Sequence, residues 1–226
     1  MTISNLASFL DLANHRGETD KATVETLCKN VLQYGFNAAF VNSCWVKFAK
    51  TYFNQNHRPG LPAPKVGTVI SFPLGQDTTE MKIYAVHEAI KKGADELDIS
   101  ANVGFLKSDS DIYLKELKRL VQAAKKISSS VVVKFIIETG LLTDSEIKKA
   151  SLLVLKSGAD FVKTCSGFGP RGSRLKDVEL IKNVVQNKIK IKVAGGITTF
   201  EQVQDFLKAG VSRIGTSKAI EIIKQK

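Results

Sequence analysis

The sequence predicts a single-domain (β/α)8 barrel that spans residues 1–226. Short apolar segments alternate eight times with longer segments of helical periodicity, which is the order of elements in this fold. Glycines follow several helical segments and precede the next strand, as in short connections from a helix to a strand. Charged side chains recur on one face of four strands, and 226 residues are an ordinary length for one such domain.

The expected strands begin and end where apolar sequence gives way to polar or glycine-rich sequence. They cover residues 8–12, 37–41, 65–72, 95–100, 131–137, 159–164, 189–194 and 213–215. The expected helices follow the 3.6-residue apolar repeat and cover residues 21–34, 44–53, 79–92, 112–127, 144–156, 175–186, 200–208 and 218–224. Thr143 before Asp144 and Glu146 marks one helix start, and Gly158 follows the end of the same helix. No linker or low-complexity stretch divides the chain.

The composition is basic, with a formal net charge of +11. The lysines are scattered over the expected helices and form no long tract, which favours solvated helix faces. No nucleic-acid-binding motif accompanies the charge. We therefore expect no nucleic-acid partner, and a basic nucleic-acid-binding barrel stays an alternative that only the net charge motivates.

No apolar run approaches the roughly 18 residues of a membrane span. Residues 1–12 also lack the basic and apolar parts of a signal peptide. We expect a cytoplasmic protein without a membrane partner.

Neither a disulfide framework nor a metal site is indicated by the sequence. The cysteines are odd in number and lack CxxC spacing; they are Cys28, Cys44 and Cys165. The histidines belong to no His/Asp/Glu cluster and fall in a loop, a loop and a helix; they are His15, His57 and His87.

Strand parity places four charged residues on one wall. Side chains alternate between the two faces of a strand, and on the fourth to seventh strands Asp98, Lys134, Lys163 and Lys192 lie opposite apolar neighbours. The outer face of each strand must pack against helices, so these four should point into the barrel. Each also lies in the later part of its strand, where barrel enzymes place their chemistry.

This cluster predicts Schiff-base chemistry. A buried lysine beside a second ammonium group has a lowered pKa, and as a neutral amine it attacks a carbonyl. The protonated nitrogen of the adduct withdraws electrons from the adjacent carbon, and a carboxylate or its bound water can then move protons. Lys163 and Lys192 would form the pair and Asp98 would supply the carboxylate. The alternative is a structural ion-pair network, with Asp98, Lys134 and Glu138, in a barrel of another function.

Glycine-rich junctions after the last three strands predict a phosphate site. Backbone N–H groups in such loops bind phosphate, and barrels commonly do this after strands seven and eight. The residues concerned are Gly167 and Gly169, Gly195 and Gly196, and Gly215 to Ser217. Tight turns without a ligand are the alternative for these glycines.

Segments along nearly the whole chain closely resemble deoxyribose-phosphate aldolase, a class I aldolase family. They are Phe9-Leu-Asp-Leu12, Phe40-Val-Asn42, Thr68-Val-Ile-Ser-Phe-Pro-Leu-Gly75, Glu96-Leu-Asp98, Asn102-Val-Gly104, Lys134 to Gly140, Asp160 to Phe168, Lys192 to Thr198 and Arg213 to Ser217. The Phe-Pro-Leu-Gly, Phe-Val-Lys-Thr and Lys-Val-Ala-Gly-Gly-Ile motifs in this order are together highly specific.

The resemblance implies reversible cleavage of 2-deoxy-D-ribose 5-phosphate to D-glyceraldehyde 3-phosphate and acetaldehyde, in deoxyribonucleoside catabolism and without a metal or organic cofactor. It matches Lys163 to the Schiff-base lysine, Lys192 to the lysine that lowers its pKa, and Asp98 to the acid/base residue working with water. The implied phosphate-binding positions are Gly167, Gly195, Gly196, Gly215 and Ser217. The implied supporting positions are Asp11, Asn42, Lys134 and Thr164. Family members are commonly homodimers or larger, so we expect a homo-oligomer.

Some positions depart from the family pattern. Ala13 replaces a usual threonine, and the loop 14–20 after it is atypical. The resemblance therefore does not fix how the phosphate is bound, and the candidates for added anion contacts are Arg171, Arg174 and Lys218. A different Schiff-base aldolase or a sugar-phosphate epimerase is the second enzyme hypothesis.

Overall fold

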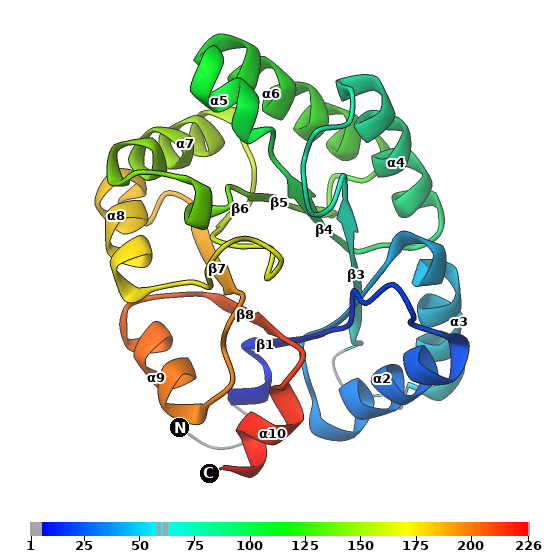
Figure 1. The fold of residues 1–226 in the computed structure, drawn as a ribbon. Coiled ribbons are helices and arrows are strands. Elements are labelled where there is room, and N and C mark those ends of the chain that lie inside the picture. Colours follow the sequence, from blue (N-terminus) through cyan, green and yellow to red (C-terminus); the bar gives the residue numbers. More distant parts are fainter. Residues whose placement is uncertain (1–5, 58–59, 61–62, 226) are drawn as a thin grey trace.

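Eight short strands, each buried along most of its length, pair in sequence order into a closed parallel barrel. This holds for the part of the chain that the structure describes, which is residues 6–57, 60 and 63–225. This computed structural model shows the strands inside a ring of helices (Figure 1). The strands are β1 (Leu10–Ala13), β2 (Ala38–Val41), β3 (Lys65–Ile70), β4 (Glu96–Ser100), β5 (Val132–Ile136), β6 (Phe161–Lys163), β7 (Lys190–Ala194) and β8 (Arg213–Thr216). The predicted fold class is confirmed.

The helices follow the strands as the alternating pattern requires. They are α2 (Lys21–Tyr34), α3 (Val46–Asn56), α4 (Thr79–Lys91), α5 (Val103–Ser108), α6 (Ser110–Ile127), α7 (Asp144–Ser157), α8 (Leu175–Val185), α9 (Phe200–Lys208) and α10 (Ala219–Lys224), with short 3-10 turns η1 (Ser43–Trp45) and η2 (Thr139–Leu141). The start and stop signals of α7 are confirmed, because Thr143 and Glu146 form a capping box and Gly158 ends the helix with φ of 82°.

Most element boundaries differ by one to three residues from the sequence prediction, and one helix was not predicted. The first strand begins at Leu10 instead of residue 8, because residues 8 and 9 form a turn in which the Phe9 N–H donates to the Leu6 carbonyl. The helix predicted over residues 44–53 is α3, which begins at Val46, after the turn η1, and ends at Asn56. The short helix α5 was not predicted. It is six residues long, too short for an apolar repeat, and the Asn102 side chain caps it by accepting from the Phe105 N–H at 3.1 Å.

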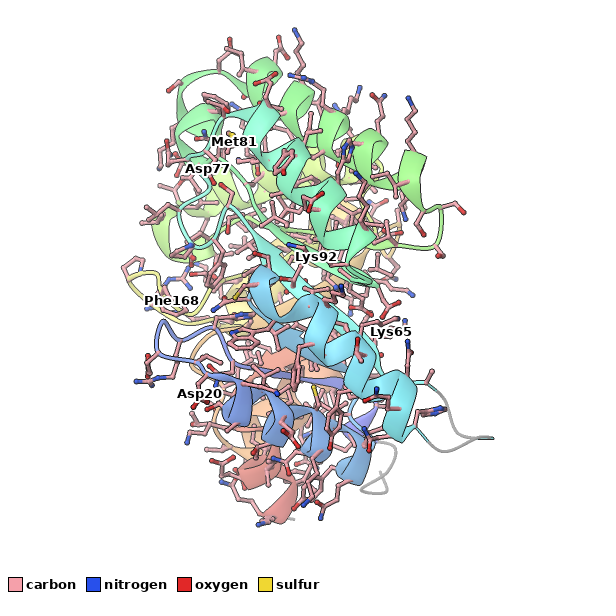
Figure 2. The ribbon with its side chains drawn as sticks, turned by 90° about the vertical axis from the view of Figure 1, so that its right-hand side faces the viewer. Asp20, Lys65, Asp77, Met81, Lys92 and Phe168 are labelled. Atoms are coloured by element: carbon pink, nitrogen blue, oxygen red, sulfur yellow. The ribbon has the colours of Figure 1, made fainter. Side chains whose placement is uncertain are left out.

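The loops that follow the strands share one face of the barrel. Figure 2, turned by 90°, shows Lys65 at the start of β3 on one side and Phe168, from the loop after β6, at the opposite edge. In Figure 1 this loop, drawn in yellow, reaches over the barrel opening. Among the described residues, no helix combines the length and the apolar character needed to cross a membrane.

The outer and inner faces of the strands differ in chemistry. Leu97 and Ile99 of β4 are fully buried in the apolar core between strands and helices, while Asp98 between them faces the interior. A buried ion pair also ties the helices behind β4 together, with Lys82 Nζ of α4 at 2.8 Å from Glu116 Oε1 of α6. Alternation along the strand thus separates the apolar layer from the charged one.

The ring of Phe40, on β2, forms part of the interior floor. Lys192 Nζ lies 3.6 Å from the ring centroid and Lys134 Nζ lies 4.9 Å from it, so the ring faces two cations. Gly67 on the adjacent β3 makes room for the ring, because a Cβ at that position would overlap the ring carbons. The glycine is required here by close packing.

We expect Gly67→Ala to lower the free energy of unfolding by about 1–3 kcal/mol, because overfilling this site displaces the Phe40 ring from under the two ammonium groups. Urea denaturation measures the effect. Gly17→Ala is the matched control: nothing lies within 4 Å of its added Cβ, and we expect a change within about 0.5 kcal/mol. Equal stabilities of the two variants would contradict this account of the barrel floor.

Candidate active site

A cavity of about 750 Å³ opens at the face where the strands end. All three predicted catalytic residues line it: Asp98, Lys163 and Lys192. All five predicted phosphate-binding residues line it as well: Gly167, Gly195, Gly196, Gly215 and Ser217. The structure therefore brings together two groups of residues that come from four of the eight strands and the loops that follow them, β4, β6, β7 and β8.

The carboxylate of Asp98 is the centre of the charged cluster. Lys163 Nζ and Lys192 Nζ both lie 2.8 Å from Oδ2, and Lys134 Nζ lies 3.1 Å from Oδ1. Strand register produces this convergence, since Asp98 pairs with Lys134 between β4 and β5, and Lys163 pairs with Lys192 between β6 and β7. All four side chains point into the barrel, as the strand alternation predicted.

A second layer of ion pairs holds two of these lysines from below. Lys192 Nζ also lies 2.7 Å from Asp11 Oδ2, and Lys134 Nζ lies 2.6 Å from Glu96 Oε2. Asn37 fixes the Asp11 carboxylate by donating to its Oδ1 at 2.8 Å. Lys192 and Lys134 therefore each contact two carboxylates.

Lys163 has a weaker set of charge partners than its neighbours. In the described strands the interior carboxylates are Asp11, Glu96 and Asp98. The interior cations are Lys134, Lys163, Lys192 and the largely buried Arg213. One cation is in excess, and Lys163 contacts a single carboxylate, which it shares with two other ammonium groups. Charge balance is reached when the Lys163 amine is neutral.

The titration behaviour follows from these contacts. Burial lowers the pKa of Lys163, and the ammonium groups of Lys192 and Lys134 lower it further, while Asp98 opposes the shift. The pKa of Lys134 is raised, because Asp98, Glu96 and Asp11 together outweigh its burial. Burial acts to raise the pKa of Asp98, but the three lysines hold that pKa well below its ordinary value. The cluster thus contains a carboxylate that stays ionised beside an amine whose pKa lies below that of an ordinary lysine.

The other predicted supporting residues hold neighbouring loops. The Thr164 hydroxyl lies 2.5 Å from Ser173 Oγ and accepts from the Ala194 N–H at 3.3 Å, so it links β6 to β7 and to the loop after β6. Asn42, after β2, donates from Nδ2 to the Arg16 carbonyl at 3.5 Å. Neither of these two side chains lines the cavity.

The two glycine loops at the cavity touch each other. A Cβ added to Gly195 would lie 3.2 Å from the Gly167 Cα, and the two glycines have φ of 87° and 91°. Glycine is needed for both reasons, close approach and left-handed backbone. Gly215 has a different role in packing, because its missing side chain leaves space for the Lys192 stem.

Of the three candidates for added anion contacts, one lines the cavity. The Arg171 guanidinium spans both Asp177 oxygens, at 2.6 and 2.9 Å, and donates to the Thr139 and Gly172 carbonyls, so it clamps the loop after β6. Arg174 is exposed and outside the cavity lining. Lys218 lines the cavity, with Nζ at 3.1 Å from Glu221 Oε1.

Two residues of this region were missed from the sequence. Phe40 lies under the Lys192 ammonium group, and no polar pattern distinguishes it from other core aromatics. His15 was assigned to a loop without a role, yet it lines the cavity together with Lys163. Among the described residues, no group of three or more His, Cys, Asp or Glu side chains is arranged to hold a metal ion.

Comparisons with known proteins match nearly the whole chain. A family model described as DeoC/LacD family aldolase matches residues 7–219. A deoxyribose-phosphate aldolase of Mycoplasmoides pirum is 38% identical over 224 residues, which are 98% of this chain and 97% of that protein. A solved structure named QR15, an aldolase, has a TM-score of 0.88 and 36% identity, and the match covers 98% of this chain and 95% of that one. A structure described as a unique tetrameric deoxyribose phosphate aldolase from Aeropyrum pernix has a TM-score of 0.89 and 26% identity, over 99% and 91% of the two chains.

The ion pair between Glu96 and Lys134 predicts a loss of stability in acid. Burial raises the pKa of Glu96, but Lys134 outweighs it and the pKa falls from 4.5 to about 2. The unfolded chain therefore takes up a proton that the folded protein does not. The stabilisation is fully present above pH about 4.5, is lost as the pH falls towards 2, and is on the order of 3 kcal/mol.

We expect Glu96→Gln to lower the urea midpoint at pH 6. The difference in midpoint between the variant and the unchanged protein should become smaller as the pH falls from 5 to 3. Glu179→Gln, on the exposed side of α8, is the control and should shift the midpoint little at any of these pH values. A Glu96→Gln curve parallel to that of the unchanged protein would contradict the assigned pairing.

Proposed function

The chain belongs to the DeoC/LacD aldolase family, and from this premise we propose that it cleaves 2-deoxy-D-ribose 5-phosphate reversibly to D-glyceraldehyde 3-phosphate and acetaldehyde. The observation that most supports this reaction is the contact of Lys163 and Lys192 with the same oxygen of Asp98 inside the cavity. We propose a metabolic role in deoxyribonucleoside breakdown, in the cytoplasm.

The first step is attack by the neutral Lys163 amine on the C1 aldehyde of the open-chain substrate. Loss of water gives a protonated Schiff base. Burial and the ammonium groups of Lys192 and Lys134 lower the pKa of Lys163, which raises the fraction of neutral amine near neutral pH. The Lys192 ammonium group is held close to Lys163 by two carboxylates, since its Nζ lies 2.7 Å from Asp11 and 2.8 Å from Asp98.

The bond between C2 and C3 breaks next. A base removes the proton of the C3 hydroxyl, the electrons of the bond move into the protonated Schiff base, and glyceraldehyde 3-phosphate leaves an enamine on Lys163. Protonation of the enamine at C2 and addition of water release acetaldehyde and restore the amine. We assign these proton transfers to Asp98 with a water molecule, because its carboxylate stays charged and lies 2.8 Å from Lys163 Nζ.

The phosphate is proposed to bind across the cavity, at the glycine loops that follow β6, β7 and β8. Gly167 and Gly195 touch there, and Gly196 and Ser217 line the same wall. Backbone N–H groups in such loops suit a phosphate. Lys218 is the cationic side chain at this wall that can add a charge contact, whereas Arg171 is occupied by Asp177.

We also propose that the protein is a homo-oligomer. The relative from Aeropyrum pernix is described as a tetramer, and helix α4 exposes two large apolar side chains, Met81 and Tyr84, at 61% and 64% of their surface. Light scattering at micromolar concentration tests this proposal, and a strictly monomeric mass would contradict it.

Borohydride reduction in the presence of acetaldehyde tests the proposed chemistry. We expect a covalent adduct on Lys163, located by peptide mass spectrometry. Lys163→Arg should remove the adduct and lower the release of acetaldehyde from deoxyribose 5-phosphate by about a thousandfold or more, with unchanged circular dichroism. Lys148→Arg, on the exposed side of α7, is the control that should keep both.

An adduct on another lysine, or no adduct, would contradict the assignment of Lys163. A panel of phosphorylated aldoses and ketoses separates the remaining enzyme hypotheses. Turnover of another sugar phosphate with no cleavage of deoxyribose 5-phosphate would favour a different aldolase or an epimerase.

A further inference from the structure

The loop between β1 and α2 holds His15 at the cavity in a fixed position. The Asn14 N–H donates to the Phe40 carbonyl at 3.0 Å, and Asn14 Oδ1 accepts from the Arg16 N–H and the Thr19 hydroxyl. The Asn42 side chain reaches the Arg16 carbonyl from the neighbouring loop. The loop is therefore tied to β2 on both sides of His15.

The imidazole of His15 completes an aromatic wall of three rings, of which His15 and Phe168 line the cavity and Phe72 contacts both. Its ring centroid lies 5.2 Å from that of Phe72, and Phe72 meets Phe168 edge to face at 5.3 Å. Lys163 and Lys192 line the same cavity. His15 is thus the member of this wall that has nitrogen atoms to offer to a bound molecule.

One nitrogen of this ring has no hydrogen-bond partner. Nδ1 is buried and finds no donor or acceptor within the described ranges of the chain. A buried polar nitrogen without a partner costs free energy, and an apolar side chain would pack against Phe72 without that cost. His15 lines the cavity, and because the torsion that turns an imidazole ring is broad, rotation about it can present this nitrogen to a bound molecule.

The imidazole stays neutral under working conditions. Burial and the ammonium groups of Lys163 and Lys192 lower the pKa of His15 to about 3, while Asp98 and a side-chain hydrogen bond with Asn42 act in the other direction. A neutral imidazole has one N–H donor and one acceptor nitrogen, which suits a hydroxyl group better than an anion.

We propose that His15 determines specificity for the hydroxylated substrate by hydrogen-bonding the C4 hydroxyl of deoxyribose 5-phosphate. The inference rests on the proposed function, which accounts for every other polar group of the open chain. C1 joins Lys163, the C3 oxygen faces Asp98 and its water, and the C5 phosphate lies at the glycine loops. The C4 hydroxyl remains, between the reacting carbons and the phosphate, and His15 offers an unpartnered nitrogen, Nδ1, at the cavity wall.

The test compares deoxyribose 5-phosphate with the 2,4-dideoxypentose 5-phosphate that lacks only the C4 hydroxyl. Acetaldehyde release gives kcat/KM for each. We expect His15→Leu to lower the value for deoxyribose 5-phosphate by about five- to tenfold, and to change the value for the dideoxy compound by less than about twofold. His15→Gln, which keeps a donor and an acceptor, should regain part of the loss.

Phe168→Leu is the matched control for packing. It alters the same aromatic wall without removing a polar atom, so it should change kcat/KM of both substrates by the same factor. Equal losses on both substrates in His15→Leu, or no loss on either, would overturn the inference.

Trapping with acetaldehyde and borohydride separates the two levels of the account. An adduct on Lys163 in both the unchanged protein and His15→Leu, without discrimination between the substrates, would overturn the role of His15 alone. Absence of the adduct in the unchanged protein would overturn the proposed function and, with it, this inference.

Discussion

The shared carboxylate of Asp98 is the interaction on which the site depends. Three ammonium groups meet it within 3.1 Å inside a closed barrel, where an uncompensated charge is costly. The fold satisfies two of them with further carboxylates, Asp11 for Lys192 and Glu96 for Lys134. Lys163 has Asp98 alone. The lowered pKa of its amine therefore results from the distribution of all the charges in the barrel.

This arrangement explains why so much of the interior is charged. The carboxylates of the lower pairs, Asp11 and Glu96, do not line the cavity, yet they fix the ammonium groups that act on Lys163. The Phe40 ring takes part in the same way, since it faces Lys192 and Lys134 at 3.6 and 4.9 Å, and Gly67 gives it room. Structural and chemical roles are thus joined in one layer of side chains.

Strand alternation allowed the interior charges to be predicted from the sequence. Lysine among β-branched residues is conspicuous, and the period of two fixes which way Asp98, Lys134, Lys163 and Lys192 point. The glycine loops after the last three strands could also be predicted from the sequence. The sequence could not show which carboxylate pairs with which lysine, because Asp98 and Lys163 are separated by 65 residues and their contact depends on the closed register.

The residues that the sequence left unassigned lack a local signal. Helix α5 has six residues, too few for a repeat, and Phe40 looks like any core aromatic. Arg171 beside a glycine loop suggested a phosphate contact, but Asp177, at the start of α8, holds its guanidinium. His15 required a view of the cavity, since its surroundings come from loops after three different strands.

The protonation state of Lys163 tests the central claim most directly. Side-chain NMR of protein labelled at lysine can follow this amine through a pH titration, with its resonance identified by its loss in Lys163→Arg. The account predicts a midpoint clearly below the ordinary lysine value of about 10.4. A midpoint at or above that value would contradict it.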